Sequence, residues 1–349
     1  MSDYLILAGL ALIMGITLAL PFFMKRVEED LEAFLFVMGI SAVSISGLWS
    51  RGLLKEAFKE PLPITITVAA AGLLLRKVRS RLSSLVHALT RRIGVSATIF
   101  VIVAALGLGS SVLTAIVSAI ILSEIISILK FNRSYEIKLT VLACYAIGLG
   151  AALTPLGEPL STIVVAKLKA PPHNAGFLYL LRLVGEWIIP GVLLCAALAA
   201  RGARSAFSKS GGLREDAHDS VKVALMRAGK VYFFVMALIL LGAGLTPLAD
   251  RFVAQMHTHT LFWLNSVSAI LDNATLAAAE ISPVMSGKQL TFILMGLLIS
   301  GGILIPGNIP NIISSAKLGI KSKEWARTAL PFGAALMTGY FVLMILLVT

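Results

Sequence analysis

Residues 154–162 read TPLGEPLST, and they interrupt an apolar segment, 136–168, that is too long for one plain membrane helix. Residues 306–311 read PGNIPN and interrupt a second apolar segment, 289–320, in the same way. Glycine and proline weaken or break helices. Broken backbone is tolerated in a bilayer only where it lines a cavity or is buried in protein. The two stretches therefore predict two discontinuous helices, a feature typical of secondary transporters.

The composition around these interruptions is that of an integral membrane protein. Of the 349 residues, 58% are hydrophobic and 14% are charged, and the mean hydropathy is +0.91. Soluble domains carry about 25% charged residues. Several apolar windows reach the roughly 20 residues that a membrane helix needs: 4–24, 177–200, 223–248 and 329–348. We therefore expect a multi-pass protein surrounded by the lipid bilayer.

The formal net charge of +12 is concentrated in short blocks beside apolar segments: 76–92, 130–138, 201–230 and 317–323. Such blocks follow the positive-inside rule and predict cytoplasmic loops. The block 76–92 is expected to be the most basic of these loops. Both chain ends then fall on the extracytoplasmic side of the plasma membrane. A nucleic-acid partner is excluded, because no stretch is long enough to form a soluble basic domain.

The order of segments predicts two related halves. We expect N-terminal scaffold helices over 1–60, a first repeat over 61–200, a cytoplasmic linker over 201–222 and a second repeat over 223–349. Each repeat reads as helix, broken hairpin, broken helix, helix, and the two halves face opposite ways. Short sequences also recur about 150 positions apart, as Gly157-Glu158 and Gly307-Asn308 do.

The apolar stretches 94–130 and 260–286 are the predicted hairpins. The first starts and ends beside basic clusters and is short for two crossings, so a re-entrant hairpin is the economical interpretation, with two short full helices as the alternative. The predicted fold is thus an all-α polytopic membrane protein. It has inverted-topology repeats, two re-entrant hairpins and two discontinuous helices.

Two acidic residues, Glu158 and Asp272, stand at breaks within apolar surroundings. A charged group at membrane depth costs at least ~2.5–3.5 kcal/mol and marks a candidate functional site. Protons and cations compete for such a carboxylate, and sodium prefers oxygen ligands as other hard ions do. Both acids are therefore candidate sodium ligands. The alternatives are a helix-capping role for Glu158 and a buried capping pair for Asp272 with Asn273.

Amide and hydroxyl side chains at the breaks and hairpin tips are expected to complete the ion or substrate site. Serine and threonine at such positions can instead bond to carbonyls of their own helix. The further candidates are Asn273, Asn308, Asn311, Thr154, Ser161, Thr162, Thr275, Ser268, Ser111 and Thr114.

Two of these motifs resemble those of a known family. Residues 268–275, SAILDNAT, are similar to the Ser-Ala-x-x-Asp-Asn signature of NhaD-type sodium/proton antiporters, and residues 154–159, TPLGEP, resemble their Thr-Pro-x-Gly-Asp-Pro break. These antiporters belong to the ion transporter superfamily, with arsenite permeases and dicarboxylate/sodium symporters. The resemblance covers roughly 94–168 and 257–320 and is nearest to a branch of cation transporters. It implies a scaffold, a mobile transport domain, elevator-like motion and a homodimer.

The chain also departs from that pattern. The antiporters carry an Asp-Asn pair in their first hairpin, whereas residues 114–119 here read TAIVSA. Glu158 stands where they have aspartate. One cation site is therefore expected to be lost or altered, and stoichiometry does not carry over.

These observations predict exchange of a monovalent cation, most simply sodium, for protons, with no cofactor and no enzymatic activity. A carrier of a small anion, a carboxylate or an arsenite-like oxyanion, is the alternative within transport, because helix N-termini at hairpin tips favour anions. An intramembrane hydrolase is disfavoured: no His-Glu-x-x-His run occurs, and only Asp272 is an aspartate placed at membrane depth. A channel is less consistent with paired broken helices.

Overall fold

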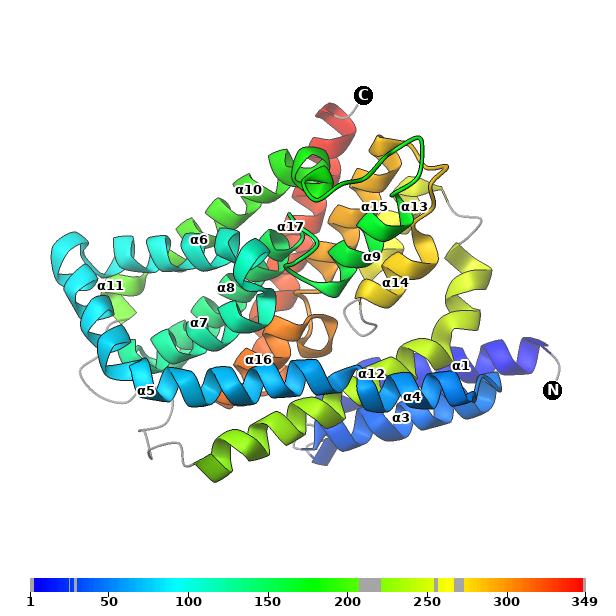
Figure 1. Ribbon diagram of the computed structural model, residues 1–349, viewed down its shortest axis with the longest axis horizontal. Coiled ribbons are helices and arrows are strands. Elements are labelled where there is room, and N and C mark those ends of the chain that lie inside the picture. The colour runs from blue at the N-terminus through cyan, green and yellow to red at the C-terminus, as the bar shows by residue number, and fades with distance from the viewer. Residues whose placement is uncertain are drawn as a thin grey trace.

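The computed structural model describes residues 3–24, 26–27, 30–206, 221–253, 257–266 and 273–347, and every regular element among them is a helix (Figure 1). Five helices in this part of the chain are long and apolar enough to cross a membrane. Their spans are Tyr4–Pro21, Val95–Leu113, Tyr179–Ala200, Ala228–Leu248 and Ser322–Leu347. The prediction of an all-α membrane protein is confirmed.

One side of the molecule is a layer of N-terminal helices joined by one helix from the second half (Figure 1). The layer consists of α1 (Asp3–Phe23), α3 (Leu31–Ser46), α4 (Arg51–Lys59), α5 (Pro61–Ile93) and α12 (Val221–Val253). Helix α12 packs along both α3 and α5. Glycine allows the close approach to α3, because a methyl group on Gly39 would lie 2.9 Å from the carbonyl oxygen of Ala237.

The predicted basic loop over 76–92 is wrong, because α5 continues as a helix to Ile93. Arginine and leucine are good helix formers, and the apolar residues of this stretch recur at helical spacing. Val86 is 3% exposed, and Leu82, four positions earlier, packs against the same core. The basic residues therefore lie on the other faces of an amphipathic helix.

The first half continues with a helical hairpin and a broken helix. Its elements are α6 (Val95–Leu113), α7 (Ala115–Leu129), α8 (Arg133–Ala151), α9 (Pro159–Lys167), α10 (Tyr179–Ala200) and α11 (Ala203–Ala206). Thr114 joins α6 to α7 with φ at 73°. Helix α6 is long enough to cross a bilayer. The 15 residues of α7 span only about 22 Å, short of the roughly 30 Å hydrocarbon core.

The second half contains a second broken helix, preceded by two short described helices. Its elements are α13 (Thr258–Leu264), α14 (Asn273–Glu280), α15 (Gly287–Ser300), the 3-10 turn η2 (Ile305–Gly307), α16 (Ile309–Leu318) and α17 (Ser322–Leu347). Packing crosses between the halves, because α14 lies against α9 and α16 lies against α7. Each half-helix that follows a break thus contacts the second arm of the other half's hairpin.

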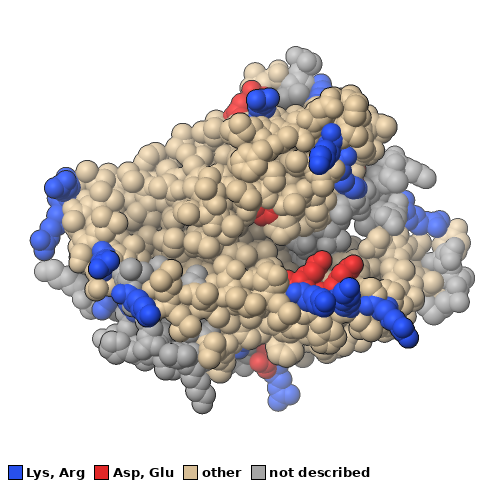
Figure 2. All heavy atoms as spheres, viewed as in Figure 1, with Lys and Arg blue, Asp and Glu red and all other residues tan. Residues whose placement is uncertain are grey.

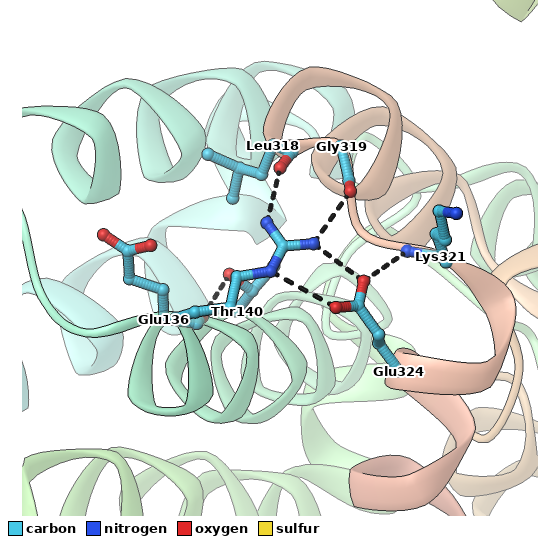
Figure 3. Close-up of polar contacts among 7 residues, drawn as sticks. Glu136, Thr140, Leu318, Gly319, Lys321 and Glu324 are labelled. Carbon is cyan, nitrogen blue, oxygen red and sulfur yellow. Dashed lines mark hydrogen bonds and ion pairs between the residues drawn. The ribbon is translucent and has the colours of Figure 1, made fainter. Parts of the chain in front are cut away.

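Three of the basic blocks meet at one end of the molecule. The guanidinium of Arg133 donates to the carbonyl oxygens of Leu318 and Gly319 and pairs with Glu324 at 2.7 Å (Figure 3). The backbone N–H of Asn132 donates to the carbonyl oxygen of Ala206. The start of α8 is therefore tied to the end of α16, the start of α17 and α11. Figure 2 shows a broad uncharged flank with Lys and Arg gathered toward its rim.

Candidate functional site

The two interrupted helices repeat the same backbone hydrogen bonds. Each bond in the first break has a counterpart in the second, 150 positions later, as Gly307 is to Gly157. The N–H to carbonyl pairs are Ala152 to Leu149, Leu153 to Gly150 and Gly157 to Thr154, and then Gly302 to Ile299, Ile303 to Ser300 and Gly307 to Leu304. The interruptions that glycine and proline predicted are therefore present, and their backbones follow one pattern.

Glu158 and Asn308 occupy equivalent positions at the starts of α9 and α16. Their backbones are extended, with φ and ψ of −157° and 160° for Glu158 and −155° and 146° for Asn308. Both side chains are buried, at 6% and 7% exposed. Neither side chain makes a capping hydrogen bond to its helix. The capping alternative for these two residues is therefore wrong.

The first break is fastened to the tip of the first hairpin. The hydroxyl of Thr154 donates to the carbonyl oxygen of Ser111 at 2.5 Å, and the N–H of Ala115 donates to the carbonyl oxygen of Gly157 at 2.9 Å. Thr114, at the joint, accepts a hydrogen bond from the N–H of Val117. Three predicted site residues, Ser111, Thr114 and Thr154, thus come together, although the hydroxyls of Ser111 and Thr114 bond to the backbone of their own hairpin.

The second break is held by Asn311, which is fully buried. Its amide nitrogen donates to the carbonyl oxygens of Gly301 and Leu304, at 2.9 Å each. The start of α14 lies beside this loop, because a methyl group on Gly301 would be 3.5 Å from the amide nitrogen of Asn273. Asn273, Asn308 and Asn311 are therefore brought together around the second break.

The second break also meets the helix that leads into the first. A methyl group on Gly148 of α8 would lie 2.6 Å from the amide nitrogen of Asn308. The thiol of Cys144, one turn earlier, lies 3.5 Å from the carbonyl oxygen of Pro310. The two discontinuous helices thus form one buried region.

Four buried polar atoms in this region have no hydrogen-bond partner among the described residues: Ser118 Oγ, Ser161 Oγ, Asn273 Nδ2 and Asn311 Oδ1. Ser161 and Asn311 are again 150 positions apart. Buried polar atoms without partners are uncommon and call for a reason such as a bound ion or water. The three oxygens are of the kind that hard cations select.

Ser118 was not among the residues predicted for the site. The signal for it is its spacing, because it follows Thr114 by four positions and so lies on the same face of α7. Thr162, which was predicted, has an exposed side chain whose hydroxyl donates to the carbonyl oxygen of Pro155 at 2.6 Å. Thr162 therefore stabilises the first break from its exposed side and does not line the buried region.

Ser268 and Asp272 lie outside the described residues, as does the side chain of Thr275. Their assignment to the site stays a prediction. Within the described ranges, no group of three or more His, Cys, Asp and Glu side chains could hold a metal ion. A cation in the described region would therefore depend mainly on amide, hydroxyl and backbone oxygens.

Two lysines, also 150 positions apart, fasten the half-helices to the hairpin arms they pack against. Lys317 of α16 forms an ion pair with the buried Glu124 of α7, which also pairs with Arg79 of α5 at 3.1 Å. Lys167 of α9 donates to the carbonyl oxygen of Ile281, directly after α14, at 2.9 Å. These contacts fix both half-helices relative to the hairpins.

A Gly148→Ala variant is expected to fold and to be slightly less stable than the wild type. Asn308 alone lies within 4 Å of the new methyl group, so the side chain of Asn308 must turn away from α8. Alanine favours the helix by about 0.5–1 kcal/mol over glycine, which limits the loss of stability. Thermal unfolding in detergent would measure the difference.

Gly339→Ala, with nothing within 4 Å of its methyl group, is the control. An unfolding midpoint for Gly148→Ala as high as that of Gly339→Ala would show that the contact of Asn308 with α8 is unimportant.

Comparison with known families gives one match over almost the whole chain. Residues 7–347 match the family described as "Protein of unknown function (DUF1646)". The chain belongs to this family. The search of curated proteins gives no match.

Proposed function

We propose that this member of a family of unknown function is a secondary transporter. It exchanges a monovalent cation, most simply sodium, for protons. The observation that carries the proposal is the pair of buried interruptions with matching backbone hydrogen bonds, at which Glu158, Ser161, Asn308 and Asn311 stand in equivalent pairs.

The chemistry of the site follows from its charges and dipoles. Glu158 binds either a proton or a cation, because the two compete for one buried carboxylate. The C-terminal ends of α8 and α15 carry partial negative charge at the breaks, which favours a cation. The oxygens of Ser161 and Asn311 complete the coordination, with Asp272 as a second carboxylate. Exchange follows because the site cannot hold the cation and the proton together.

The architecture that we propose for transport uses the halves as inverted repeats with two re-entrant hairpins. The layer of α1, α3, α4, α5 and α12 is the scaffold, and the elements around the two breaks form the mobile part of an elevator. The crossed packing of α7 with α16 and of α9 with α14 supports movement as one unit. In this arrangement both termini lie outside the plasma membrane, and the working form is a homodimer.

A carrier of a small anion is the second candidate. The amide nitrogen of Asn273 lacks a partner among the described residues, and the N-terminal ends of α9 and α16 begin at the breaks. Helix N-termini with free donors favour anions such as a carboxylate or an oxyanion. The protein would then take up the anion together with sodium or protons, rather than exchange a cation for protons.

Cation-induced proton flux in proteoliposomes, followed with a pH-sensitive dye, tests the proposal. Sodium, lithium, potassium and calcium are added in turn to vesicles with wild-type protein, with Asp272→Asn and with no protein. We expect a sodium- or lithium-dependent pH change that Asp272→Asn abolishes. The absence of a pH change with every cation, from protein shown to be folded, would overturn the antiport proposal. Cation-dependent uptake of a labelled carboxylate or of arsenite would favour the second candidate.

A further inference from the structure

A pocket of about 350 Å³ opens at the end of the molecule where the basic blocks meet. Its lining comes from the start of α8, the turn between α10 and α11, α11 itself, and α17. The polar side chains in the lining are Asn132, Ser134, Tyr135, Lys138, Arg201, Ser205 and Thr328. None of the described residues that line it is acidic. The pocket thus offers two cations with hydroxyl and amide groups around them.

The walls of this pocket are fixed by hydrogen bonds between its elements. The backbone N–H and side-chain amide of Asn132 both donate to the carbonyl oxygen of Ala206, at 3.2 and 3.4 Å. The hydroxyl of Tyr135 donates to the carbonyl oxygen of Ala199 at 2.5 Å. The start of α8 and the end of α10 are therefore joined before any ligand arrives, which reduces the ordering needed for binding.

Two carboxylates near the pocket in the described part of the chain, those of Glu136 and Glu324, are engaged elsewhere. Glu136 is 1% exposed and accepts a hydrogen bond from the N–H of Phe131, and Figure 3 shows its carboxylate directed away from Arg133. Glu324 is held by Arg133 and by the N–H of Lys321. Lys138 and Arg201 therefore face the pocket without an acidic residue in its lining.

We propose that this pocket binds the phosphate group of an anionic ligand. Guanidinium and ammonium groups with hydroxyl donors suit phosphate oxygens, and basic pockets between membrane helices bind anionic lipid headgroups. An anionic glycerophospholipid is the favoured source of the phosphate. Apolar side chains are exposed elsewhere on the two long helices beside the pocket, with Leu194 of α10 45% exposed and Leu330 of α17 46% exposed. Free phosphate shares the chemistry and is the other source.

Ligand binding to purified protein in detergent tests this site without any transport assay, so the result does not depend on which ion is moved. The probes are short-chain phosphatidylglycerol, short-chain phosphatidylcholine and inorganic phosphate. Each is added to wild type, to Lys138→Gln/Arg201→Gln, and to the control Arg204→Gln/Arg327→Gln. The control removes two exposed charges from the same end of the molecule without altering the lining of the pocket.

We expect wild type and control to bind phosphatidylglycerol about tenfold more tightly than phosphatidylcholine, and the pocket variant to lose that preference. Binding of inorganic phosphate that is lost in the same variant would support the site and make free phosphate its ligand. Equal binding of all probes to wild type and pocket variant would overturn the proposal. If the double variant is unstable, Lys138→Arg/Arg201→Lys keeps the charges and should retain the preference.

Discussion

A Glu158→Gln variant is expected to fold and to move no more protons in response to sodium than vesicles without protein. Glutamine has nearly the same shape as glutamate but can neither ionise nor carry the exchanged proton. The fold should tolerate the change, because glutamine fills the same buried volume as glutamate. The loss of a negative charge at the start of α9 should lower stability by no more than about 1 kcal/mol. Flux in proteoliposomes and thermal unfolding in detergent measure the two quantities.

The same substitution at Glu186 is the matched control, because that residue is exposed on α10. Glu186→Gln should keep wild-type flux. Wild-type flux from Glu158→Gln would remove this carboxylate from the coupling mechanism and leave Asp272 as the acid to examine. Loss of flux together with loss of folded protein would mean that Glu158 is needed for the structure, and Glu158→Asp would then separate charge from packing.

The interruptions were the part of the fold that the sequence predicted best. Glycine and proline disrupt helices locally, so the breaks before Glu158 and Asn308 could be recognised without any knowledge of packing. The extent of α5 could not be recognised from the sequence in this way. Basic residues beside an apolar segment are compatible with a loop or with a helix end, and only the burial of Val86 against the core distinguishes the two.

The candidate site shows the same division between local and long-range information. The sequence singled out Asn308 and Asn311 as amides at a break in an apolar segment, and the structure buries both at the second break. It did not single out Ser118, because its buried hydroxyl becomes apparent only with α7 packed against α16 across the halves. The hydrogen bond from the Thr162 hydroxyl to Pro155 likewise depends on how the first break folds back. Residue types at a break could be recognised from the sequence, whereas contacts between distant segments could not be predicted from it.

The contact of α6 with α8 is the point at which a single methyl group should do most damage. Gly107 and Gly150 bring the two backbones together, and a methyl group on Gly150 would collide with the carbonyl group of Gly107. A hydrogen bond also joins the two helices, because the hydroxyl of Ser110 on α6 lies 2.9 Å from the carbonyl oxygen of Ile147 on α8. Small residues at such crossings are what allow membrane helices to associate.

A Gly150→Ala variant is therefore expected to lose about 3 kcal/mol or more of stability, the upper end of what overpacking costs. Size-exclusion chromatography in detergent should show little monodisperse protein, with a lowered thermal midpoint for what remains. Gly109→Ala on α6 is the control, because its methyl group would meet only Leu113 at 3.8 Å. Equal yield and stability of the two variants would contradict the close approach of α6 and α8. That approach also fixes the first break, because α8 leads directly into it.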